Sequence, residues 1–82
     1  MIVSAQVAIY PLRQERLTPA ITAVSRALEA AGLRPEMGPM STTVTGEATT
    51  VFRALEQAFA QAGRLGHVVI TVTISNACPV GR

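Results

Sequence analysis

The chain contains no lysine, no aspartate and no tryptophan, and it has one cysteine and one histidine. Without aspartate a Ser-His-Asp set is excluded, and Cys78 and His67 lack a third group to orient them, so covalent catalysis has little support. One cysteine cannot form a disulfide within the chain, and one histidine cannot hold a metal ion by itself. These absences predict a non-enzymatic protein without a metal or cofactor, in a reducing, cytoplasmic setting.

Charge and aromatic residues are also sparse. Seven arginines and five glutamates give a formal net charge of +2, and the arginines are spread along the chain. The aromatic residues are Tyr10, Phe52 and Phe59. Because a nucleic-acid interface needs a basic stripe or stacking aromatic rings, the sequence predicts no nucleic-acid partner.

Long hydrophobic runs are absent as well. No stretch of about 18 apolar residues occurs, so we predict no membrane-spanning helix and no membrane partner. Residues 1–4 lead directly into an alternating pattern, so we expect no secretion signal. With 82 residues the chain has room for one domain, which we place at residues 1–76 with a C-terminal tail at 77–82. So small a core favours self-association.

Residues that alternate between apolar and polar predict the strands. The alternation is clear at 2–10 and at 67–76, and we expect Pro11 to close the first strand because proline lacks the ladder donor. An extended stretch at 34–37, a Gly-Pro turn and a β-branched stretch at 42–45 predict a short hairpin between them.

Two segments with apolar residues at helical spacing predict helices. The first is expected to begin with Thr18 as its N-cap and to end at Gly32, which can take the left-handed conformation. The second is expected to open at Gly46-Glu47 and to end at Gly63. Its predicted apolar stripe consists of Ala48, Val51, Phe52, Leu55, Ala58, Phe59 and Ala62.

The element order β-α-β-β-α-β predicts an α+β, ferredoxin-like fold. Right-handed crossovers place both helices on one face of a four-stranded antiparallel sheet, with the first and third strands central and the others at the edges. The long, uncharged last strand would then leave an edge that needs cover. We therefore expect self-association through this strand and through the helix-free sheet face. That face is expected to carry Gln6, Tyr10, Thr71, Thr73 and Ser75 among Ile2, Ala8 and Val69.

Residues 38–47 concentrate four hydroxyl groups, two glycines and one carboxylate. Hydroxyls and exposed backbone groups suit hydrogen bonding to a planar heterocycle, and Glu47 suits an amino group or a cation. The same residues have a structural explanation, because threonine favours strands and a glutamate in a first helical turn complements the helix dipole. Composition alone leaves both interpretations open.

At these residues the chain resembles the thiamine-binding, YkoF-like proteins, once grouped as a domain of unknown function. The resemblance extends from Ile2 to about Asn76. It is carried by four segments: residues 3–11, 31–33, 38–47 and 51–52. Thr42 and Gly46 match the threonine-then-glutamate-glycine signature of the family, whereas Thr45 stands where the family usually has a glutamate.

The resemblance implies a ferredoxin-like fold, assembly into homodimers or homotetramers through the sheets, and non-catalytic binding of thiamine or its hydroxymethylpyrimidine part. We accordingly predict a ligand pocket near the hairpin and the open sheet face, without a catalytic residue. The expected binding residues are Gln6 and Thr73 on the sheet, Tyr10 for stacking, Thr42 and Thr43 as hydroxyls, and Glu47 as a counter-charge. A homo-oligomeric assembly or regulatory module without a small-molecule ligand is the alternative hypothesis.

Overall fold

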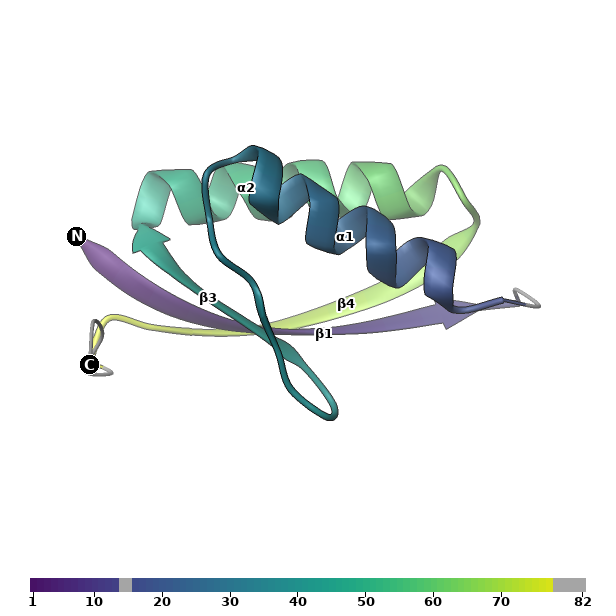
Figure 1. Ribbon diagram of the computed structural model, residues 1–82, viewed down its shortest axis with the longest axis horizontal. Coiled ribbons are helices and arrows are strands. Elements are labelled where there is room, and N and C mark those ends of the chain that lie inside the picture. Colours follow the sequence, from purple (N-terminus) through teal and green to yellow (C-terminus); the bar gives the residue numbers. More distant parts are fainter. Residues whose placement is uncertain (14–15, 78–82) are drawn as a thin grey trace.

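The computed structural model describes residues 1–13 and 16–77, so Cys78 and nearly all of the predicted tail lie outside the described residues. The elements are β1 (Ile2–Leu12), α1 (Thr18–Ala30), β2 (Glu36–Met37), β3 (Thr42–Glu47), α2 (Ala48–Gly63) and β4 (His67–Ser75). The strands form one antiparallel sheet in the order β2-β3-β1-β4, and both helices lie on one side of it (Figure 1). This confirms the predicted ferredoxin-like α+β fold.

β1 does not stop at Pro11, so that prediction was wrong. The strand continues to Leu12, and Pro11 pairs with Val68 of β4. On its other side β1 pairs with β3 only as far as Val7, which faces Thr42. Beyond Val7 that side of β1 has no strand neighbour, so a proline there removes no ladder hydrogen bond from the sheet.

The two ends of α1 differ in how well the sequence predicted them. The N-cap is Leu17, without a side-chain cap, so the prediction of Thr18 as the cap was wrong. At the C-terminus Gly32 has the predicted left-handed conformation, with φ of 86°. The amide of Gly32 donates to the Glu29 carbonyl at 2.9 Å and that of Leu33 to the Leu28 carbonyl at 3.1 Å. These two bonds form a Schellman motif, which turns Leu33 into the core.

The boundary between β3 and α2 lies two residues later than predicted. Gly46 and Glu47 are the last residues of β3, facing Val3 and Ile2 of β1, and the helix begins at Ala48. The strand extends because it is a central strand, and pairing with the start of β1 continues to its last residue. Glu47 is therefore the N-cap residue, with extended backbone, rather than a member of the first helical turn.

The core lies between the sheet and the helices and consists mainly of valine and alanine. Its helical part is formed by Ala20, Val24 and Leu28 of α1 and by Val51, Ala54, Ala58 and Ala62 of α2. Phe52 and Phe59, predicted to belong to this stripe, are instead 58% and 54% exposed. The small side chains at the centre of the stripe let α2 approach the sheet closely, which leaves the two rings at its margin.

Gly46 lies where β3 passes under Leu33. A Cβ atom built at Gly46 would meet Leu33 Cδ2 at 2.7 Å, closer than van der Waals contact allows. Because Leu33 is only 8% exposed, it has little room to yield. We expect Gly46→Ala to lower the free energy of unfolding by about 1–2 kcal/mol through overpacking, measured by urea denaturation.

Gly63 provides the matched control for this substitution. It ends α2, and a Cβ atom there would meet nothing within 4 Å. Gly63→Ala is therefore expected to leave stability unchanged or to raise it by about 0.5 kcal/mol, since alanine restricts the unfolded chain. Equal stabilities of the two variants would contradict close packing at Gly46.

Candidate functional site

A cavity of about 230 Å³ lies on the helix-facing side of the sheet, between β1, the start of α1 and the β2–β3 turn. Its apolar floor and far wall come from β1 and α1, and its other wall comes from the turn. The lining residues are Val7, Ile9, Ile21, Met37, Gly38, Pro39, Met40, Ser41 and Thr42.

The cavity exists because β1 is longer than its neighbour. β3 begins at Thr42, opposite Val7, whereas β1 continues to Leu12. The helix-facing side chain of Ile9 therefore has no β3 residue beside it. The turn at 38–41 passes this gap, projecting beyond the sheet in Figure 1, and Ile21 of α1 covers it from the helix side.

Thr42 carries the most deeply buried polar group of the cavity. It is 4% exposed, and its Oγ1 donates to Met37 Sδ at 3.4 Å. Donating through its single hydrogen leaves the hydroxyl oxygen able to accept from a ligand. Across the turn, the Gly38 amide donates to the Ser41 carbonyl at 2.7 Å, which closes the loop, and Ser41 lines the cavity next to Thr42.

All nine residues that line the cavity are uncharged. A charged or phosphorylated group placed there would lose water without gaining an opposite charge, which is unfavourable. The thioethers of Met37 and Met40 and the ring of Pro39 instead offer polarizable and apolar surfaces, which suit the face or edge of an aromatic ring. The arrangement fits a neutral, planar molecule with one or two hydrogen-bonding groups.

Four of the six predicted binding residues lie on the open face of the sheet. Gln6 faces Thr43 on one side and Thr73 on the other, so the three form one polar row across β3, β1 and β4. Tyr10 lies farther along the same face of β1, opposite Val69, and is 49% exposed. In the row next to Gln6, Ser4 Oγ and Thr45 Oγ1 are hydrogen bonded at 3.1 Å.

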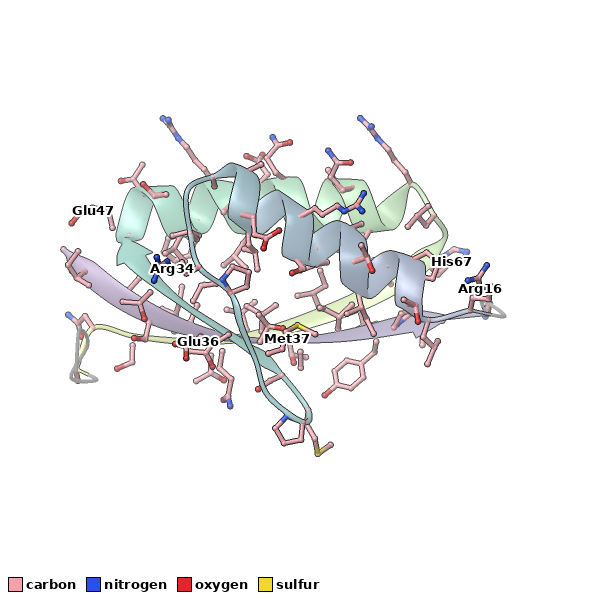
Figure 2. The ribbon with its side chains drawn as sticks, in the orientation of Figure 1. Arg16, Arg34, Glu36, Met37, Glu47 and His67 are labelled. Atoms are coloured by element: carbon pink, nitrogen blue, oxygen red, sulfur yellow. The ribbon has the colours of Figure 1, made fainter. Side chains whose placement is uncertain are left out.

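The other two predicted residues lie elsewhere. Successive strand residues point to opposite faces, so Thr42 lines the cavity while Thr43 faces the helix-free side. Glu47 lies at one end of the sheet, with Met37 at its middle and His67 towards the other end (Figure 2). The N-terminal amine of Met1 donates to Glu47 Oε1 at 3.1 Å and to Oε2 at 3.3 Å. The six residues therefore do not share one pocket.

Most of the residues that line the cavity could not be recognised from the sequence. Val7, Ile9 and Ile21 have the periodicity of core residues, and no pattern distinguishes a residue that also lines a cavity. The usable signal was the turn at 38–41, where two methionines flank a Gly-Pro pair. The pocket was predicted near this hairpin and the open sheet face, whereas the cavity lies beside the hairpin on the helix-facing side.

Neither helix within residues 1–13 and 16–77 has the length and hydropathy to cross a membrane. The same part of the chain holds no group of three or more histidine, cysteine, aspartate or glutamate side chains arranged to hold a metal ion.

In a comparison with protein families, the model of the YKOF-related family matches residues 2–81. The chain belongs to the YKOF-related family. The resemblance first noted in residues 38–47 is thereby confirmed for nearly the whole chain. A search among curated proteins finds no match.

Solved structures of proteins from other organisms share the fold of this member of the YKOF-related family. A Streptococcus pneumoniae protein is 24% identical, with a TM-score of 0.87, and the match covers 99% of this chain and 92% of that one. A hypothetical protein of Methanocaldococcus jannascii is 20% identical, with a TM-score of 0.84 and coverage of 94% and 81%. A Thermotoga maritima protein, described as a candidate for thiamine biosynthesis or salvage, is 21% identical, with a TM-score of 0.81 and coverage of 92% and 83%.

Proposed function

We propose that this protein binds a small heterocyclic ligand in the cavity beside the β2–β3 turn, without making or breaking a covalent bond. Hydroxymethylpyrimidine, alone or as the pyrimidine half of thiamine, is the proposed ligand. Family membership and the thiamine-related description of the Thermotoga maritima protein support this class of ligand. The observation that carries the proposal is the uncharged cavity with two hydroxyls at its wall.

The size of the cavity supports a ligand with one ring. Pockets for drug-sized molecules usually measure about 300–1,000 Å³, and this cavity is smaller, at about 230 Å³. A substituted pyrimidine matches that space, whereas both rings of thiamine exceed it. In this proposal the cationic thiazolium ring of thiamine extends out of the uncharged cavity into solvent, where its charge stays hydrated.

The polar groups of the cavity support an aminopyrimidine in particular. The ring amino group can donate to the oxygen of Thr42, whose own hydrogen is engaged by Met37 Sδ. The Ser41 hydroxyl can donate to a ring nitrogen. The thioethers of Met37 and Met40 can contact the ring, an interaction worth about 0.3–1.5 kcal/mol for each contact.

Isothermal titration tests the proposal. Hydroxymethylpyrimidine and thiamine should both release or absorb heat with saturation, and hydroxymethylpyrimidine phosphate should bind more weakly than the unphosphorylated compound, because its charge meets an uncharged wall. Flat titrations with both unphosphorylated compounds at millimolar concentration would exclude this ligand class. Preference for the phosphate would exclude this cavity as the site.

We further propose that the protein assembles with copies of itself, in the cytoplasm, through β4 and the open sheet face. β4 is an edge strand of nine residues with no arginine or glutamate, so its outer backbone groups are available for pairing. Tyr10 and Val69 are adjacent on the open face and nearly half exposed, which supports an apolar contact there. An assembly module without a ligand is the second candidate function, and the edge position of β4 supports it as well.

Two charges on β4 provide the test of assembly. The double variant Thr71→Lys, Thr73→Lys places two positive charges on the helix-free face of β4. Two copies of the chain that pair through this strand and face would bring these charges close together, which is unfavourable. We expect light scattering coupled to size exclusion to give the mass of a dimer or tetramer for the unmodified chain and of one chain for the variant.

The matched control adds the same charges to a helix. Gln57 and Gln61 are exposed on α2, so Gln57→Lys with Gln61→Lys should leave the oligomer mass unchanged. A single-chain mass for the unmodified protein at micromolar concentration would refute the assembly proposal, as would an unchanged mass for the β4 variant.

A further inference from the structure

Two of the three methionines of the chain belong to one wall of the cavity. Met37 and Met40 flank the Gly38-Pro39 pair, and they are 63% and 85% exposed. The third, Met1, is 69% exposed and does not line the cavity. Exposed thioethers are oxidised readily to sulfoxides, so the wall of this cavity combines ligand contact with chemical reactivity.

Met37 also connects the exposed turn to Thr42, the buried polar residue of the cavity. Its Sδ accepts the hydrogen bond from Thr42 Oγ1 at 3.4 Å, and the two residues are directly paired between β2 and β3. A thioether is a weak acceptor, whereas a sulfoxide carries a polar oxygen that accepts strongly. Oxidation therefore changes both the volume beside Thr42 and the partner of its hydroxyl.

We propose that Met37 and Met40 form an oxidation-sensitive wall, and that their conversion to sulfoxides by a hydroperoxide releases the ligand from the cavity. This inference rests on the proposed function of the same cavity. In each step the O–O bond of the hydroperoxide breaks and an S–O bond forms. The sulfur loses two electrons, and the hydroperoxide is reduced to water or an alcohol.

The expected loss of affinity follows from the chemistry of the cavity. Val7, Ile9 and Ile21 offer no donor to a new sulfoxide oxygen. The oxygen must therefore accept from the Thr42 or Ser41 hydroxyl, or turn out to solvent and displace its side chain from the cavity. A sulfoxide oxygen that takes the Ser41 hydroxyl leaves a ring nitrogen of the ligand without its partner, and one that turns outward displaces a thioether from the ring; the first loss alone weakens binding by about tenfold or more.

The test compares hydroxymethylpyrimidine binding before and after treatment with hydrogen peroxide. Mass spectrometry of peptides locates each added oxygen, and circular dichroism confirms that the oxidised protein is folded. We expect the dissociation constant to rise about tenfold or more once residues 37 and 40 are oxidised. Treatment with both methionine sulfoxide reductases should restore the original value, which separates a reversible modification from damage.

One double variant assigns the effect to the cavity. Met37→Leu with Met40→Leu removes both thioethers at nearly constant volume, so its affinity, whatever its starting value, should be equal before and after peroxide. Met1 is 69% exposed and stays oxidisable in this variant, so it controls for oxidation of a thioether elsewhere. Equal binding by reduced and oxidised protein would overturn the inference alone, as would a peroxide effect that persists in the double variant. Absence of binding by the reduced protein would overturn the proposed function and the inference with it.

Discussion

Replacing Ile21 with tryptophan is expected to weaken hydroxymethylpyrimidine binding by about a hundredfold, equivalent to about 2.8 kcal/mol. Ile21 is half-buried in the first turns of α1, and its side chain covers the gap beside Ile9 where the ligand is proposed to lie. The indole of Ile21→Trp occupies that gap, so the ligand and the side chain compete for one space. Isothermal titration measures the loss.

The same substitution placed farther along α1 controls for a general effect of the larger side chain. Arg26 is exposed on α1 and does not line the cavity, so Arg26→Trp should bind the pyrimidine like the unmodified chain. Thermal denaturation followed by circular dichroism verifies that both variants are folded. Unchanged affinity in a folded Ile21→Trp variant would show that the ligand binds elsewhere, with the Gln6 row on the open face as the next site to substitute.

Replacing Leu28 with alanine is expected to lower the free energy of unfolding by about 3 kcal/mol and the melting temperature by roughly 15 °C. Leu28 is fully buried and is the largest side chain that the structure excludes from solvent. Its neighbours in the core are mostly alanine and valine, which are too short to close the space that Leu28→Ala leaves. The cost therefore includes a cavity term as well as the lost apolar burial.

Urea denaturation measures the loss at Leu28, and the adjacent position supplies the control. Glu29 is exposed on the same turn of α1, so Glu29→Ala should change stability by less than about 0.5 kcal/mol. A loss below about 1 kcal/mol for Leu28→Ala would mean that α1 settles onto the sheet after the truncation, contrary to the close packing described above.

The fold was predictable because its periodicities are strong. The alternation in β1 and β4, the two helical stripes and the glycine at the end of α1 each specify one conformation, and β-α-β-β-α-β order leaves few right-handed arrangements. The errors lie at boundaries that depend on neighbours. Pro11 stays in β1 because no strand pairs on its other side, and Glu47 stays in β3 because Ile2 pairs with it.

The predicted site residues do not lie together, for a reason visible at Thr42 and Thr43. Adjacent hydroxyl residues in a strand look equivalent in a sequence, but their side chains point to opposite faces of the sheet. Thr42 shares the helix-facing side with Val7 and Thr43 shares the open face with Gln6, and this depends on the register between β3 and β1. Likewise, Ile21 and Ile9 read as core residues because a cavity is a property of the space between elements. Phe52 and Phe59 are exposed for a similar reason. The width of an apolar stripe does not determine how much of that stripe the helix buries against the sheet.

The two walls of the cavity are attached to the protein with very different strength. Val7 and Ile9 belong to a central strand, whereas the turn is joined to the sheet through a β2 ladder of two residue pairs, Glu36 with Thr43 and Met37 with Thr42. Detaching such a short ladder costs far less than unfolding the domain. The turn can therefore detach from the sheet while the domain stays folded, and a ligand bound in the cavity would have to hold that turn in place.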